Sequence, residues 1–108
     1  MTTHTENVYI PKGDYGFNLA FTLYDSSGDV FNPTGYTVTL KVWTYDVPST
    51  LLLSGTGGIT DAANGKVYYT IASGDFNTEG EFIGEIELTK AGAVESFRTH
   101  KIHVTESG

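Results

Sequence analysis

The chain contains no cysteine and few basic residues, and both shortages exclude classes of protein. Without cysteine it has no disulfide framework, no thiolate zinc site and no thiol nucleophile. Six basic residues stand against thirteen acidic ones, which leaves a net charge of −7. Because nucleic acids and anionic membranes are bound through lysine and arginine, we expect neither as a partner.

The sequence also lacks long hydrophobic runs. No segment approaches the roughly 18 consecutive apolar residues of a membrane-spanning helix. Residues 1–7 lack the basic and apolar regions of a signal peptide. We therefore expect synthesis in the cytoplasm without a signal peptide, and no membrane partner.

The residues that are abundant are those of β-strands and turns. The 108 residues include 13 glycines, 7 tyrosines and 6 phenylalanines, and 39% of the chain is hydrophobic. Aromatic and β-branched side chains suit a pleated sheet, and glycine supplies the dihedral angles of turns. A chain of this length can bury a single core. The composition therefore predicts one globular domain made of strands.

Alternation of apolar and polar residues, with a period of two, locates the strands. It predicts strands over residues 15–24, 36–45, 66–72, 80–90 and 93–105, with a short edge strand over residues 51–53. The inward residues of these strands form the predicted core: Val38, Leu40, Val42, Val67, Tyr69, Ile71, Phe82, Ile86 and Leu88.

Local signals describe how the strands are joined. Residues 64–65, Asn-Gly, predict a turn because both tolerate positive φ, and residues 91–92 predict a hairpin. Residues 73–79 are a candidate for one capped helical turn. In the last strand Phe97 and Ile102 lie at odd spacing, so a regular strand cannot bury both. We expect a bulge or break between them.

Seven or so strands without a convincing helix predict a small β-sandwich. We expect a single domain over residues 8–105, with loose segments at residues 1–7 and 106–108.

Five segments carry a resemblance to a known family. They are residues 23–29 (LYDSSGD), 33–42 (PTGYTVTLKV), 59–70 (ITDAANGKVYYT), 80–88 (GEFIGEIEL) and a closing strand that ends in Val104. Over about residues 9–105 the chain resembles the immunoglobulin-like N-terminal domain of phage baseplate upper proteins and related phage tail domains. The resemblance implies an all-β, immunoglobulin-like β-sandwich of about seven antiparallel strands.

The resemblance also implies a role. Such domains are structural parts of the virion, so the expected function is non-enzymatic assembly in a phage tail, baseplate or decoration layer. The expected partners are other virion proteins and further copies of the chain, and no cofactor is expected. In true immunoglobulin domains a tyrosine and a cysteine stand where Phe82 and Gly84 occur here. The subclass pinned by a disulfide is therefore excluded.

Candidate catalytic and metal-binding residues are few. His4 lies in the expected loose segment, and His100 and His103 should point to opposite faces of their strand, so no metal site is expected. The Asp-rich turn at residues 25–29 lacks the spacing of an EF-hand calcium loop.

Three carboxylates form an acidic face on one strand. Glu81, Glu85 and Glu87 share its outward side, and alternate residues of a strand lie roughly 6.5–7 Å apart, a separation also found between the carboxylates of inverting glycosidases. A hydrolase built on Glu85 and Glu87 is one interpretation. A solvated acidic stripe that biases the chain toward basic partner surfaces is the favoured one.

Trp43, the single tryptophan, marks a candidate partner-binding patch. The expected register places it outward beside Lys41 and Tyr45, and Tyr68 extends the patch if its strand lies in the same sheet. Such aromatics serve protein interfaces or stack on sugar rings. The alternative function is therefore a carbohydrate-binding or adhesin module for a cell-surface glycan. A third possibility is that the N-terminal segment or a loop covers Trp43.

Overall fold

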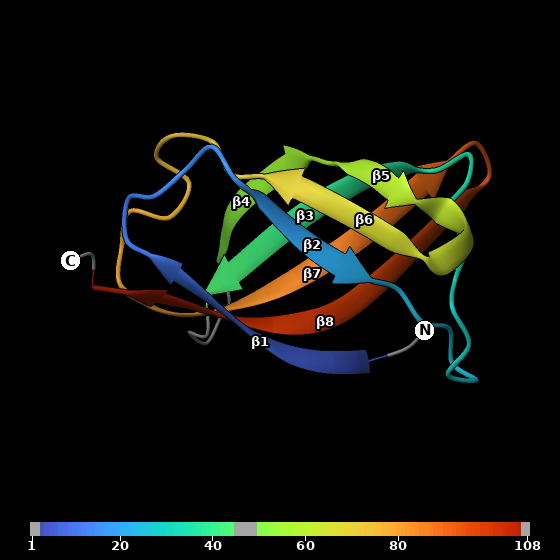
Figure 1. Ribbon diagram of the computed structural model, residues 1–108, viewed down its shortest axis with the longest axis horizontal. Helices are drawn as coiled ribbons and strands as arrows, with labels where there is room; N and C mark the ends of the chain where they lie inside the picture. The colour runs from blue at the N-terminus through green and yellow to red at the C-terminus, as the bar shows by residue number, and fades with distance from the viewer. Residues whose placement is uncertain (1–2, 45–49, 107–108) are drawn as a thin grey trace.

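A computed structural model describes residues 3–44 and 50–106, with the side chains of residues 8–44, 50–97 and 101–106. Two sheets pack face to face as an all-β sandwich (Figure 1). The five-stranded sheet contains, in spatial order, β1 (Thr3–Pro11), β8 (Ala93–Thr105), β7 (Gly80–Lys90), β3 (Thr37–Thr44) and β4 (Leu51–Thr56). The three-stranded sheet contains β2 (Asn18–Thr22), β6 (Lys66–Thr70) and β5 (Gly58–Asp61).

The core between the sheets is the predicted one, enlarged. All nine predicted core residues are buried. The core also contains residues of β8 and of segments that were not assigned to it from the sequence. These further members are Ile10, Leu19, Phe21, Leu23, Phe76, Phe97, Ile102 and Val104. Leu19, Phe21 and Leu23 alternate along the chain, as the period of two predicts for one buried face.

The predicted bulge in the last strand is confirmed. Gly84 pairs with His100 and Glu85 pairs with Arg98, so residue 99 has no counterpart on β7. The extra residue changes the parity of β8. Phe97 and Ile102 can therefore both face the core, where each is at most 1% exposed.

The number and direction of the strands differ from the expectation. The described residues form eight strands rather than about seven. β1 runs parallel to β8, whereas the other strand pairs of the five-stranded sheet are antiparallel. Residues 3–7, expected as a loose segment, belong to β1. Backbone hydrogen bonds along a ladder depend little on side-chain type, so polar residues can join a strand without the alternation that predicts one.

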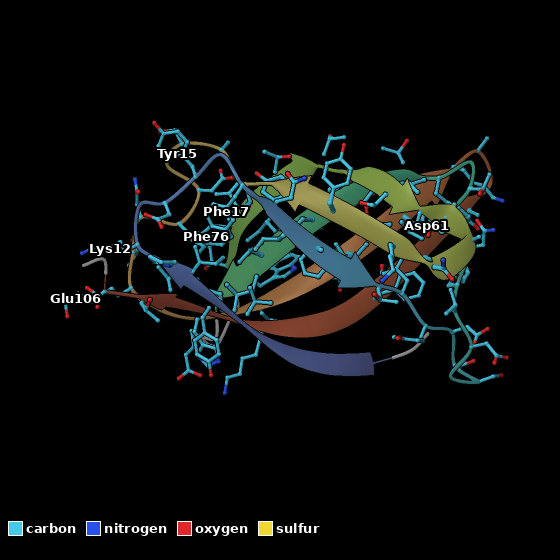
Figure 2. All side chains as sticks on the ribbon, in the orientation of Figure 1. Lys12, Tyr15, Phe17, Asp61, Phe76 and Glu106 are labelled. Atoms are coloured by element: carbon cyan, nitrogen blue, oxygen red, sulfur yellow. The ribbon has the colours of Figure 1, made fainter. Side chains whose placement is uncertain are left out.

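Two local expectations also change. Of the strand predicted over residues 15–24, only β2 (Asn18–Thr22) forms. Tyr15 and Phe17, which precede it, are 60% and 40% exposed. Figure 2 shows Tyr15 projecting from the sandwich. Residues 73–79 form no helical turn; residues 73–76 form a turn and the rest are irregular. The carboxylate of Asp75 accepts hydrogen bonds from the Ala72 N–H at 2.8 Å and from the Tyr69 hydroxyl, which anchors this loop to the core.

No helix in the described part of the chain is long and apolar enough to cross a membrane.

Candidate interaction surface

The outer face of the five-stranded sheet carries a row of apolar side chains from three strands. Trp43 on β3 pairs in register with Ile83 on β7 and with Leu51 on β4. Trp43 and Ile83 are half-buried, and Leu51 at the sheet edge is 42% exposed. Side chains that are neighbours across a sheet contact one another on the same face. We call Ile83, Trp43 and Leu51 the apolar row.

Ion pairs lie on both sides of the apolar row. Lys41 Nζ lies 3.0 Å from Glu87 Oε2, and Lys101 Nζ lies 2.9 Å from Glu81 Oε1. Glu85 faces Lys41 in the register of β3 and β7. The acidic face predicted from Glu81, Glu85 and Glu87 is thus interleaved with lysines from adjacent strands. Because these lysines offset the carboxylates locally, the face presents mixed charge and not an uncompensated acidic stripe.

Tyr9 extends the same outer face at the other edge of the sheet. Its ring stacks on His103 with centroids 4.6 Å apart and planes 12° from parallel, and the tyrosine remains 65% exposed. His103 Nδ1 lies 3.8 Å from Glu81 Oε1. The outer face therefore runs from Tyr9 on β1, through charged residues, to the apolar row.

The carboxyl of Glu81 reports the electrostatics of this face. A hydrogen bond from Lys101 lowers its pKa, and the charges of Lys101 and His103 act in the same direction. Because the pKa of Glu81 is lower in the folded state, its interaction with Lys101 stabilises the fold at pH values above the ordinary carboxyl pKa. This stabilisation is lost as the pH falls through the lowered pKa.

We expect an NMR titration of the wild-type chain to give Glu81 a midpoint below that of an ordinary glutamate. Lys101→Ala should raise the midpoint, because it removes both the hydrogen bond and the nearest positive charge. Lys41→Ala, which breaks the ion pair with Glu87, is the matched control and should leave Glu81 unchanged. An identical Glu81 midpoint in Lys101→Ala and the wild type would contradict this account.

The patch predicted from Lys41, Trp43, Tyr45 and Tyr68 is not a single surface. Lys41 and Trp43 do share the outer face of the five-stranded sheet, but Tyr68 lies on β6 in the three-stranded sheet. Its ring lies over Gly58, where a Cβ atom would come within 2.6 Å of the tyrosine hydroxyl oxygen. The two sheets turn their outer faces in opposite directions, so Tyr68 cannot extend the patch. Tyr45 lies outside the described residues.

Two pockets lie near Phe82 and Leu52. One of about 190 Å³ is bordered by Asp75, and another of about 380 Å³ is bordered by Glu79 and Glu81. Each of these carboxylates contacts another group: Asp75 accepts from Tyr69, Glu79 lies 3.4 Å from Lys12 Nζ, and Glu81 pairs with Lys101. Neither Glu85 nor Glu87 borders them.

Glu85 and Glu87, the carboxylates of the hydrolase interpretation, lie beside Lys41. Glu87 binds Lys41, and both Glu85 and Glu87 lie half-buried on a pleated face. Burial raises the pKa of the Tyr69 hydroxyl, and its hydrogen bond to Asp75 raises it further, but this group lies in the core. Among the described residues no three carboxylates, histidines or cysteines gather as a metal site.

A scan of protein-family models and a search of curated proteins found no match to this chain.

Some residues of this surface were not singled out from sequence. Ile83 alternates with glutamates on an outward face, and an apolar residue in such a position is a usable signal of an interface. Leu51 belongs to an apolar run whose orientation the alternation rule does not resolve. Lys101 joins the face because β8 pairs with β7, and Tyr9 joins it because β1 pairs with β8.

Proposed function

We propose that this chain is a non-enzymatic structural component of a phage particle, in the tail, baseplate or a decoration layer, and that it acts by binding other virion proteins. The observation that carries the proposal is the apolar row, a half-buried tryptophan between two aliphatic neighbours, with ion pairs on both sides. Protein interfaces have this arrangement of an apolar centre with aromatic anchors and a polar rim.

We also propose that the sandwich is immunoglobulin-like, and the strand order supports this. Immunoglobulin constant domains place strands B, E and D in one sheet and C, F and G in the other. The order β2-β6-β5 matches the first set, and β3-β7-β8 matches the second. On this assignment β4 is an additional strand beside C, as in variable domains, and β1 is a first strand paired with G.

The particle assignment is tested by locating the protein. Mass spectrometry of purified phage particles should detect the chain in a fixed ratio to the major tail proteins, and immunogold labelling should place it at one position on the particle. Particles that are infectious and complete but contain no copies would overturn the proposal.

We expect Trp43→Ala to reduce incorporation into particles strongly. Truncating a central aromatic anchor typically costs about 2 kcal/mol or more of binding free energy, which is roughly 30-fold in affinity. The measurement is quantitative mass spectrometry of particles assembled with the variant. Tyr15→Ala, which removes a 60% exposed tyrosine outside the sheet, is the matched control and should incorporate normally.

Two outcomes would contradict this use of Trp43. Normal incorporation of a folded Trp43→Ala variant would remove the apolar row from the interface. Glycan-array binding that is lost in Trp43→Ala would favour the adhesin alternative, although Trp43 and Tyr68 cannot form one stacking platform because they lie on different sheets.

A further inference from the structure

Four of the described strands lie at sheet edges, and β2 differs from the other three. β6 pairs with one side of β2, and no described strand lies on its other side (Figure 1). An unpaired strand edge is a template for another strand, and proteins usually protect such edges with charge, proline, bulges or very short strands.

The other edges each carry some of this protection. β1 contains Glu6, ends at Pro11 and has a register shift against β8. The register of β4 against β3 shifts between Val42 and Trp43. β5 is only four residues long and ends at Asp61, and its register against β6 also shifts. β2 has five residues without charge, proline or glycine, and its ladder with β6 is regular throughout.

Two backbone hydrogen bonds establish which groups of β2 face outward. Ile71 N–H donates to the Phe17 carbonyl, and Leu23 N–H donates to the Gly65 carbonyl, so residues 17 and 23 direct their backbone groups toward the β6 side. In an antiparallel ladder such pairs recur at every second residue. The backbone groups of Asn18, Ala20 and Thr22 therefore point away from β6, toward the unpaired side.

We propose that a second copy of this chain pairs with this edge, β2 against β2, about a two-fold axis at Ala20. An antiparallel arrangement centred there places Ala20 opposite its symmetry mate as a hydrogen-bonded pair. It also places Asn18 opposite Thr22 of the other copy, and Leu19 opposite Phe21. The two three-stranded sheets become one six-stranded sheet with a continuous apolar inner face.

The chemistry of β2 favours a second copy as the occupant. Two chains that each carry a net charge of −7 repel, so a contact between copies is best made where neither presents charge. β2 meets that requirement along its whole length. The small side chain of Ala20 at the axis avoids a steric clash, and each polar residue faces a neutral polar one. The edge is thus complementary to itself.

This pairing deepens the proposed function and rests on it, because a structural protein of a phage particle is present there in repeated copies. It uses a different surface. β2 lies in the three-stranded sheet, and the apolar row lies on the outer face of the five-stranded sheet. Failure of the β2 contact can therefore be distinguished from failure of the particle assignment.

A cross-linking experiment tests the geometry, and the absence of native cysteine makes it clean. A hydrogen-bonded antiparallel pair has Cα atoms about 5.5 Å apart, within the ~4.4–6.8 Å that a disulfide spans. Ala20→Cys should form a covalent dimer under mild oxidation. Thr60→Cys, an exposed outward position on β5, is the matched control and should stay largely monomeric. Equal cross-linking of the two variants would overturn the proposal.

Solution mass supplies the second test. Light scattering of the wild-type chain should approach twice 11.7 kDa as concentration rises. Ala20→Pro removes an N–H that faces away from β6, a change that an edge strand tolerates, and should return the mass to that of the monomer. Circular dichroism verifies that this variant is folded, and Ala20→Lys, which places like charges at the axis, repeats the test without changing the backbone.

The outcomes separate the two proposals. Trp43→Ala should still dimerise while failing to enter particles, and Ala20→Lys should lose the dimer while its apolar row is unchanged. A wild-type chain that stays monomeric at about 1 mM, where a pairing free energy of only ~4 kcal/mol would be visible, overturns the β2 contact. A dimer that persists in both Ala20 variants does the same.

Discussion

Phe97→Ala is expected to lower the free energy of unfolding by about 3–5 kcal/mol, the usual cost of removing a buried phenylalanine side chain. Phe97 is 1% exposed on β8, faces Ile86 in register, and meets the Phe31 ring edge-on with centroids 5.2 Å apart. The truncation removes this contact between a strand and the loop that covers it. Small domains are stable by only about 5–15 kcal/mol, so the variant should be markedly less stable.

Urea denaturation followed by the fluorescence of Trp43, the single tryptophan, measures this change. Val94→Ala is the matched control, because Val94 lies on the same strand and is 65% exposed. It should change the unfolding free energy by no more than about 0.5 kcal/mol. If the two variants were equally stable, the burial of the Phe97 side chain in the core would be contradicted.

Gly65→Ala is expected to destabilise the fold by about 2–5 kcal/mol, for two reasons that act together. Gly65 has φ of +67°, which side chains with L configuration rarely adopt. It is also enclosed, since an added Cβ would lie 2.9 Å from the carbonyl oxygens of both Leu23 and Phe31. These oxygens belong to the backbone, so the strain cannot be relieved by rotating a side chain.

Gly35→Ala separates the two causes. Gly35 has φ of +85°, but nothing lies within 4 Å of an added Cβ. This variant should therefore show only the conformational cost, about 1–2 kcal/mol. The difference between the two variants measures the close contact at Gly65. Equal losses of stability would show that the backbone angle alone requires glycine at both positions.

Much of the local structure could be predicted from the sequence. The strand over residues 80–90 has its predicted bounds, the turn at residues 91–92 joins it to β8, and the odd spacing of Phe97 and Ile102 indicated the bulge. These features depend on residues close together in the chain. One exception is the segment of residues 73–79, where Asp75 accepts a hydrogen bond from the Tyr69 hydroxyl, a partner outside the segment itself.

The candidate surface was predictable only in part. The outward direction of Trp43 and Lys41 followed from alternation along one strand. Whether Tyr68 shared their face depended on which sheet contained its strand, and alternation contains no information on that point. The acidic face shows the same limit, because Lys41 and Lys101 reach the glutamates from other strands.

By itself, the sequence determined an all-β chain with one core, the inward residues of its main strands and the places where it turns. These properties follow from the two-residue period of a strand and from the dihedral preferences of glycine and asparagine, which act locally. Only the tertiary structure decided the strand order, the parallel pairing of β1 with β8 and the position of β2 at an edge of the sheets that the described residues form. These depend on backbone hydrogen bonds between segments distant in the sequence, and every residue has the carbonyl acceptor and every residue but proline the N–H donor that such bonds require.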